Sequence, residues 1–254
     1  MKRLIVIFFV IISSDMIAVD EGWDLAARHQ FNEARDVFVD KTRNGKDIRR
    51  DQLSEAAILI NLQPRTPANL DRADQLLTTL AETTDDVGIS ALYLSGRIDQ
   101  SHRIPYRIAE AKTHYTQLAS LDSEYPLAQA GIVQLALLEL YDESLPVADR
   151  FSAAESLQSK LTGNFARSDY HLVLARSYLF FQAGDDHALT HFLAAIKQGI
   201  TTDRIRADAL ISAGELARDL GQSTAERQCY EQFISENPRD PRKPTVQSRL
   251  EALR

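Results

Sequence analysis

Apolar residues recur along most of the chain at spacings of three and four, the period of an α-helix with one buried face. Residues 53–60, 172–179 and 210–217 show this spacing clearly. Several of these segments carry a Gly or Ala in the middle, where a missing or small side chain lets two helices pack closely. The pattern predicts an all-α protein built from closely packed helices.

A second pattern places Ala four residues before a large apolar residue, so that both lie on one helix face. It occurs as Ala34 with Phe38, Ala73 with Leu77, Ala111 with Tyr115, Ala153 with Leu157 and Ala188 with Phe192, and a less regular copy begins at Ala225. The copies follow one another at roughly 35 to 42 residues, and an amphipathic segment precedes each. A repeat of this length indicates stacked helix–turn–helix units.

These features resemble the tetratricopeptide repeat family, whose helices A and B carry small and large residues at set positions. The clearest copies are residues 170–200 and 208–238. The resemblance implies a right-handed α-α superhelix of about six helical hairpins over residues 19–241. Val246, Leu250 and Leu253 predict a capping helix within residues 242–254. Because the motifs are degenerate, a related helical-hairpin solenoid is the structural alternative.

Turn and capping signals agree with this division. Prolines fall between or at the edges of the expected helices, at positions 64, 67, 105, 126, 146 and 238. The run from Ser223 to Glu226 predicts a capping box at the start of the last helix B. No linker or change in composition separates a second domain, so the pattern favours one repeat domain.

Composition supports a helical chain of 254 residues, with 31 Ala, 31 Leu, 10 Gly and 8 Pro. Few Gly and Pro argue against collagen-like, low-complexity and turn-dense all-β chains. Cys229 is the only cysteine, which excludes an intramolecular disulfide. We expect it to be a small buried hydrophobe, with a reactive or pairing thiol as the alternative.

The first eighteen residues differ from the rest. Lys2 and Arg3 precede nine apolar residues at 4–12, and a more polar stretch follows. This order is typical of a secretory signal peptide, and the apolar run is too short to span a membrane. We expect the signal peptide to be cleaved after Ala18, which removes residues 1–18. Cleavage after Ser14 is the alternative. An uncleaved anchor or a buried first helix is the alternative.

The leader and the absence of any Asn-x-Ser/Thr site favour an extracytoplasmic location, in the bacterial periplasm. The net charge is −7. A mildly acidic chain has no broad positive field for phosphates, which argues against nucleic acid as a partner. We also expect no integral membrane span after processing.

Candidate chemistry is sparse. His187 and His191 lie four apart on one expected helix and are candidates to share a metal ion. Ala188 stands where a zincin has Glu, so we expect surface or packing histidines instead. Glu139 and Glu143 predict a solvated carboxylate pair. With no glycine-rich phosphate loop and no nucleophile elbow, the sequence predicts no catalytic residue, no metal, no cofactor and no enzymatic activity.

The family resemblance implies that helices A line a concave groove that holds a partner. The matching positions are Tyr93, Arg97, Gln100, Ala128, Ile132, Leu135, Tyr170, Val173, Ser177, Phe180, Phe181, Ile211, Glu215 and Arg218. Phe180 and Phe181 are the sharpest candidates because these rings and Tyr178 cannot all occupy one narrow core stripe. Packing between repeats is the alternative. The family's Lys, Asn and Arg clamp for C-terminal carboxylates is missing, which disfavours a chaperone-tail receptor.

The sequence therefore predicts an exported, non-catalytic scaffold that binds a protein or peptide in its groove, with bacterial envelope assembly as one setting. Two alternatives remain open. One is a metal-binding or enzymatic protein on a helical scaffold, which depends on His187 and His191. The other is an architectural protein that self-assembles through the open ends of its stack.

Overall fold

The computed structural model describes residues 20–253, so the expected leader at residues 1–18 lies outside the described residues. Within residues 20–253 the chain is helical and contains no strand, as predicted. The helices are α1 (Glu21–Ala27), α2 (Phe31–Asn44), α3 (Ile48–Asn61), α4 (Pro67–Leu80), α5 (Asp86–Arg97), α6 (Ile108–Ser120), α7 (Pro126–Leu140), α8 (Val147–Ser156), α9 (Asn164–Phe180), α10 (Asp185–Gln198), α11 (Asp203–Asp219), α12 (Ser223–Glu236) and α13 (Lys243–Glu251). A π-helical turn (Ile98–His102) extends α5, and a 3-10 turn (Leu157–Lys160) extends α8.

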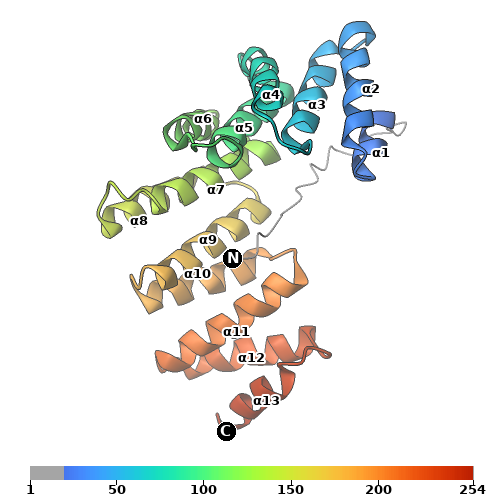
Figure 1. The fold of residues 1–254 in the computed structure, drawn as a ribbon. Helices are drawn as coiled ribbons and strands as arrows, with labels where there is room; N and C mark the ends of the chain where they lie inside the picture. The colour runs from blue at the N-terminus through green and yellow to red at the C-terminus, as the bar shows by residue number, and fades with distance from the viewer. Residues whose placement is uncertain (1–19, 254) are drawn as a thin grey trace. The chain divides into compact units, whose positions relative to one another are not determined.

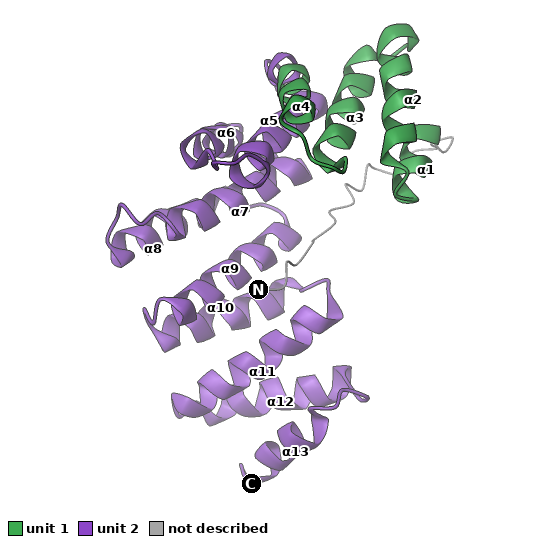
Figure 2. Cartoon of the chain, in the orientation of Figure 1, with its two compact units in different colours: residues 1–77 green, residues 78–254 purple. Residues whose placement is uncertain are grey.

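The helices divide into two compact units, residues 1–77 and 78–254, and the division falls within α4 (Figure 2). In the first unit α2 packs against both α1 and α3. Its small core holds Ala34, Phe38 and Ile58. Glu55 is buried on α3, where its carboxylate accepts a hydrogen bond from Thr42 and pairs with Arg72 at 3.0 Å. Because a buried carboxylate needs such partners, Glu55 fastens α2 and α4 to α3.

In the second unit consecutive helices pack as the pairs α5–α6, α7–α8, α9–α10 and α11–α12 (Figure 1). Each pair also contacts the next, through α6 with α7, α7 with α9, and α10 with α11. One continuous hydrophobic core runs through these pairs, from Ile89 to Val246. The predicted helical pairing is therefore present along the described chain.

The packing within three pairs follows one rule. A glycine on the first helix lies against an aromatic ring on the second: Gly22 against Phe38, Gly96 against Tyr115 and Gly214 against Tyr230. A Cβ atom built on each of these glycines would lie 2.3 to 2.6 Å from a ring carbon, inside van der Waals contact. All three rings are fully buried. The missing side chain of helix A thus makes room for the large residue of helix B.

The predicted repeat positions agree with the structure in four of the five copies, where both members of each Ala and large-residue pair are buried. In the fourth copy Ala153 and Leu157 are only partly buried, and Phe151 and Ala154 fill the core instead. That register was wrong because α8 is short and its last turn tightens to a 3-10 turn at Leu157.

The predicted capping box was also wrong. Gln222 is the N-cap of α12 and makes no side-chain capping bond. Ser223 is already inside the helix, and Glu226 is buried. The first turn of α12 is therefore held by packing rather than by a serine cap.

The C-terminal helix α13 packs against α12, the second helix of the last pair. Val246 of α13 is buried in the hydrophobic core, and Leu250 packs at the edge of that core. Arg249 pairs with Glu215 of α11 at 2.6 Å, and Arg242 pairs with Asp208 of α11 at 2.6 Å. Across residues 20–253, none of the helices combines the length and apolar character that a membrane crossing requires.

Candidate functional site

Three aromatic rings meet at one surface of the second unit, and we call Tyr141, Phe180 and Phe181 the aromatic patch. The Tyr141 ring centroid lies 5.8 Å from that of Phe180 and 5.3 Å from that of Phe181, and the two phenylalanines meet edge to face at 4.9 Å. Phe180 is 69% exposed and Tyr141 is 46% exposed. Aromatic side chains of this size are seldom left in water as a cluster unless a partner covers them.

The patch has a rigid base in the core between α8 and α9. The ring of Phe151 stacks on that of Tyr178 at 3.9 Å and meets Phe181 edge to face at 6.2 Å. Phe151 and Tyr178 are buried, and Phe181 is half-buried above them. Phe181 therefore anchors the patch to the core, and Phe180 points outward from the last turn of α9.

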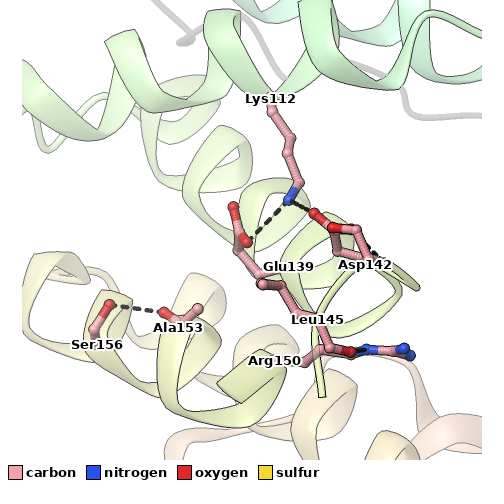
Figure 3. Close-up of polar contacts among 8 residues, drawn as sticks. Lys112, Glu139, Asp142, Leu145, Arg150, Ala153 and Ser156 are labelled. Carbon is pink, nitrogen blue, oxygen red and sulfur yellow. Dashed lines mark hydrogen bonds and ion pairs between the residues drawn. The ribbon is translucent and has the colours of Figure 1, made fainter. Parts of the chain in front are cut away.

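The loop between α7 and α8, which presents Tyr141, is held by two cations (Figure 3). Lys112 reaches from α6 and pairs with Glu139 at 3.0 Å and with Asp142 at 2.6 Å. Arg150 of α8 donates its Nε–H to the carbonyl oxygen of Leu145 at 2.7 Å. The loop is thus tied to helices on both sides, which lowers the entropy that a partner would have to remove on binding.

The electrostatics of this loop agree with its geometry. The hydrogen bond from Lys112, with help from Ser144, holds the pKa of Asp142 well below its usual range. Burial lowers the pKa of Lys112, but its bonds to Asp142 and Glu139 outweigh burial and raise it. Both groups are therefore charged at neutral pH. The predicted Glu139 and Glu143 pair does not form, because α7 ends at Leu140 and Glu139 pairs with Lys112 instead.

The guanidinium of Arg150 also lies over the ring of Phe181, 5.7 Å from its centroid. A cation over an aromatic face is attracted by the ring quadrupole. Arg150 therefore joins the loop to the patch as well as to α8.

Two buried histidines, His171 of α9 and His191 of α10, lie side by side. The Nδ1 atoms of His171 and His191 are 2.9 Å apart and share a hydrogen bond. The Nε2 atom of His191 lies 3.8 Å from Glu155, which accepts a hydrogen bond from the Tyr178 hydroxyl at 2.5 Å. One imidazole must donate and the other accept, so at least the accepting ring is neutral. Burial lowers the pKa of both histidines, to about 4 for His191, where neighbouring His171 adds to the effect.

His187 and His191, the predicted candidates for a shared metal, do not point to a common site. His191 is buried and directs Nδ1 at His171, whereas His187 is exposed and stacks on Tyr178 at 5.0 Å. Within the described part of the chain, no three or more His, Cys, Asp or Glu side chains gather as a metal site. The histidines act here as packing and hydrogen-bonding groups.

The structure divides the predicted groove positions into two groups. Buried positions are Tyr93, Ala128, Ile132, Leu135, Tyr170 and Ser177. Tyr170 shows why, because its ring is fully buried and its hydroxyl donates to the carbonyl oxygen of Ala154. These side chains lie in the core between helical pairs, which corrects their expected place in an open groove. They therefore offer no surface to a partner.

The other predicted positions reach solvent. They are Arg97, Gln100, Val173, Phe180, Phe181, Ile211, Glu215 and Arg218. Three of them have polar partners in the fold: Gln100 accepts from the Tyr115 hydroxyl, Glu215 pairs with Arg249, and Arg218 pairs with Asp219. Only Phe180 and Phe181 gather with another ring at the surface.

Sequence reasoning missed Tyr141, Lys112 and Arg150 as members of the patch and its support. Tyr141 follows the end of a helix and carries no repeat signal. The apolar residues Leu145 and Val147, exposed around a proline in a polar loop, were the available sign of an unusual surface. His171 was missed as the partner of His191 because the two lie on different helices.

No model of a protein family matches the chain, and no curated protein matches it.

Proposed function

We propose that this protein is an exported, non-catalytic scaffold of the tetratricopeptide-like kind, which binds a protein or peptide partner through the aromatic patch. The observation that carries the proposal is the exposure of Phe180 and Tyr141 on a base that holds them rigidly. Exposed aromatic rings in a fixed geometry are the side chains that most often dominate the affinity of protein interfaces. The patch thus has the properties of an anchor.

The helical pairs support the scaffold part of the proposal. A stack of hairpins offers an extended surface and needs no chemistry to bind a partner. The right-handed superhelix, the extracytoplasmic location and a role in the bacterial envelope belong to the proposal, and they rest on the repeat pattern and on the leader at residues 1–18.

The decisive experiment compares two phenylalanines on the same helix. Phe165 and Phe180 both lie on α9 and are both 69% exposed, but only Phe180 belongs to the aromatic patch. A photoreactive phenylalanine analogue is placed at each position in native cells, and the crosslinked partner is identified and purified. Its affinity is then measured for wild type, Phe180→Ser and Phe165→Ser.

We expect the partner to crosslink at position 180, and Phe180→Ser to weaken its binding by about tenfold or more, since a hot-spot residue contributes about 2 kcal/mol. Phe165→Ser should leave the affinity within about twofold. Thermal unfolding should be the same for both variants, because both rings are exposed. Equal effects of the two substitutions, or no effect of either, would refute the proposal.

A further inference from the structure

Carboxylates border the aromatic patch on two sides. Glu143 lies in the α7–α8 loop two residues from Tyr141, and Asp149 lies in the first turn of α8. Asp185 and Asp186 form the first turn of α10, directly after the turn that follows Phe181. All four residues are exposed. The stretches of chain that carry the rings therefore present exposed negative charge.

The cations nearby leave much of this negative charge uncompensated. The two stretches of chain that carry the patch, residues 139–150 and 176–186, contain six carboxylates against two cations, and Lys112 of α6 adds a third cation. The carboxylates are Glu139, Asp142, Glu143, Asp149, Asp185 and Asp186, and the two cations are Arg150 and Arg176. Lys112 pairs with Glu139 and Asp142. Arg150 keeps its charge, because the Leu145 carbonyl that it bonds is neutral, and its guanidinium lies over the Phe181 ring. In the described residues, no ion pair involves Glu143 or Asp149.

These carboxylates differ in whether they also stabilise the start of a helix. Asp149, Asp185 and Asp186 each lie in the first turn of a helix, where the helix dipole stabilises a negative charge. Glu143 lies outside any helix and has no such role. Its charge, two residues from the exposed ring of Tyr141, is available to a ligand.

We infer that the aromatic patch binds a segment of a partner protein in which an apolar side chain is flanked by Lys or Arg. The inference rests on the proposed function and names its partner's chemistry. The apolar side chain would cover the exposed face of Phe180 and Tyr141. The flanking cations would meet the carboxylates around the patch and the faces of the aromatic rings. An acidic partner would be repelled by the same border.

Three synthetic 14-residue amphipathic peptides test the chemistry: one of Leu and Lys, one of Leu and Gln and one of Leu and Glu. Their binding is measured by fluorescence anisotropy at low and at physiological salt. We expect the Leu–Lys peptide to bind most tightly and the Leu–Glu peptide least. Added salt should weaken the Leu–Lys complex, since exposed charges are screened within about 8 to 10 Å.

Two sets of variants locate the contact. Phe180→Ser should weaken the Leu–Lys peptide by about tenfold, and Phe165→Ser should not. Glu143→Gln combined with Asp149→Asn should weaken it about threefold to tenfold and leave the Leu–Gln peptide unchanged. Glu231→Gln, which removes an exposed carboxylate on α12, controls for the general charge of the protein.

The outcomes separate this inference from the proposed function. If binding depends on Phe180 but the Leu–Glu and Leu–Lys peptides bind equally, the patch is a docking site and the inferred chemistry is wrong. Equal effects of Glu231→Gln and of the Glu143 and Asp149 double variant would also overturn it, because the attraction would then come from net charge. If no peptide and no native partner depends on Phe180, the proposed function falls as well. Peptide-free self-association that depends on Phe180 would assign the patch to a second copy instead, against the inference.

Discussion

The close approach of helices at Gly214 tests the packing rule that joins the repeats. Gly214 lies inside α11, where helix propensity alone favours Ala over Gly by about 1 kcal/mol. A Cβ atom at this position would lie 2.3 Å from Cε1, 2.7 Å from Cδ1 and 2.9 Å from Cζ of Tyr230. Propensity and packing therefore predict opposite signs for Gly214→Ala.

The structure sets the size of the packing penalty. Carbon atoms in contact prefer separations of about 3.5 to 4.0 Å, so the Tyr230 ring would have to retreat by about 1 Å or more. Tyr230 is fully buried, and no solvent-facing side is open to it. Adding a methyl group to such a core costs about 1 to 3 kcal/mol. After the gain in propensity, we expect Gly214→Ala to destabilise the protein by about 1 kcal/mol, and by up to about 2 kcal/mol.

The assay is urea unfolding followed by circular dichroism, together with thermal melting, where about 1 kcal/mol corresponds to about 2 to 4 °C for a chain of this size. Gly163→Ala is the matched control, because nothing lies within 4 Å of its Cβ position and its φ of −83° suits any residue. Gly163 is the N-cap of α9, where Ala is less favourable than Gly, so we expect that control to cost up to about 1 kcal/mol and to cost the same with and without the Tyr230 ring.

A double-variant cycle then isolates the contact. In a Tyr230→Leu background the ring is gone, and Gly214→Ala should become neutral or stabilising by up to about 1 kcal/mol. The reasoning is refuted if Gly214→Ala raises the melting temperature of the wild-type chain, or if its effect is the same with and without the Tyr230 ring.

Three further outcomes follow from the described contacts. Burial lowers the pKa of His171, and it lowers that of His191 to about 4. Between about pH 6.5 and 4 the unfolded chain therefore binds more protons than the folded chain, so the free energy of unfolding should fall as pH falls through this window. His191→Gln should flatten that dependence in urea titrations, and an unchanged slope would contradict the assignment. Burial raises the pKa of the Cys229 thiol to about 11, so a disulfide reagent at pH 8 should label it only after unfolding, whereas rapid labelling of the folded protein would show an accessible thiol. Tyr178→Phe should cost about 1 to 3 kcal/mol by removing the hydrogen bond to Glu155, and a melting curve identical to wild type would show that this bond contributes nothing.

The spacing of apolar residues along the chain already predicts the helices, their pairing and most of the core. Ala111 and Tyr115, four residues apart, are both fully buried, as their spacing predicts. Such a pattern is readable because a helix repeats every 3.6 residues and a buried face must repeat with it. The buried state of Cys229 was predictable for the same reason, since it lies beside Tyr230 on the inward face of α12.

Which of the remaining helix faces meet solvent depends on how the helical pairs stack on one another. Tyr170 and Ile132 looked like groove residues, but neighbouring helices bury them, because α7 contacts both α6 and α9 and α9 contacts both α7 and α10. The aromatic patch joins Tyr141 to Phe180 from different hairpins. Neither residue carries a signal for the other, since side chains that meet across a hairpin boundary share no local period. The helices follow from local spacing, whereas the surface follows from how the pairs stack.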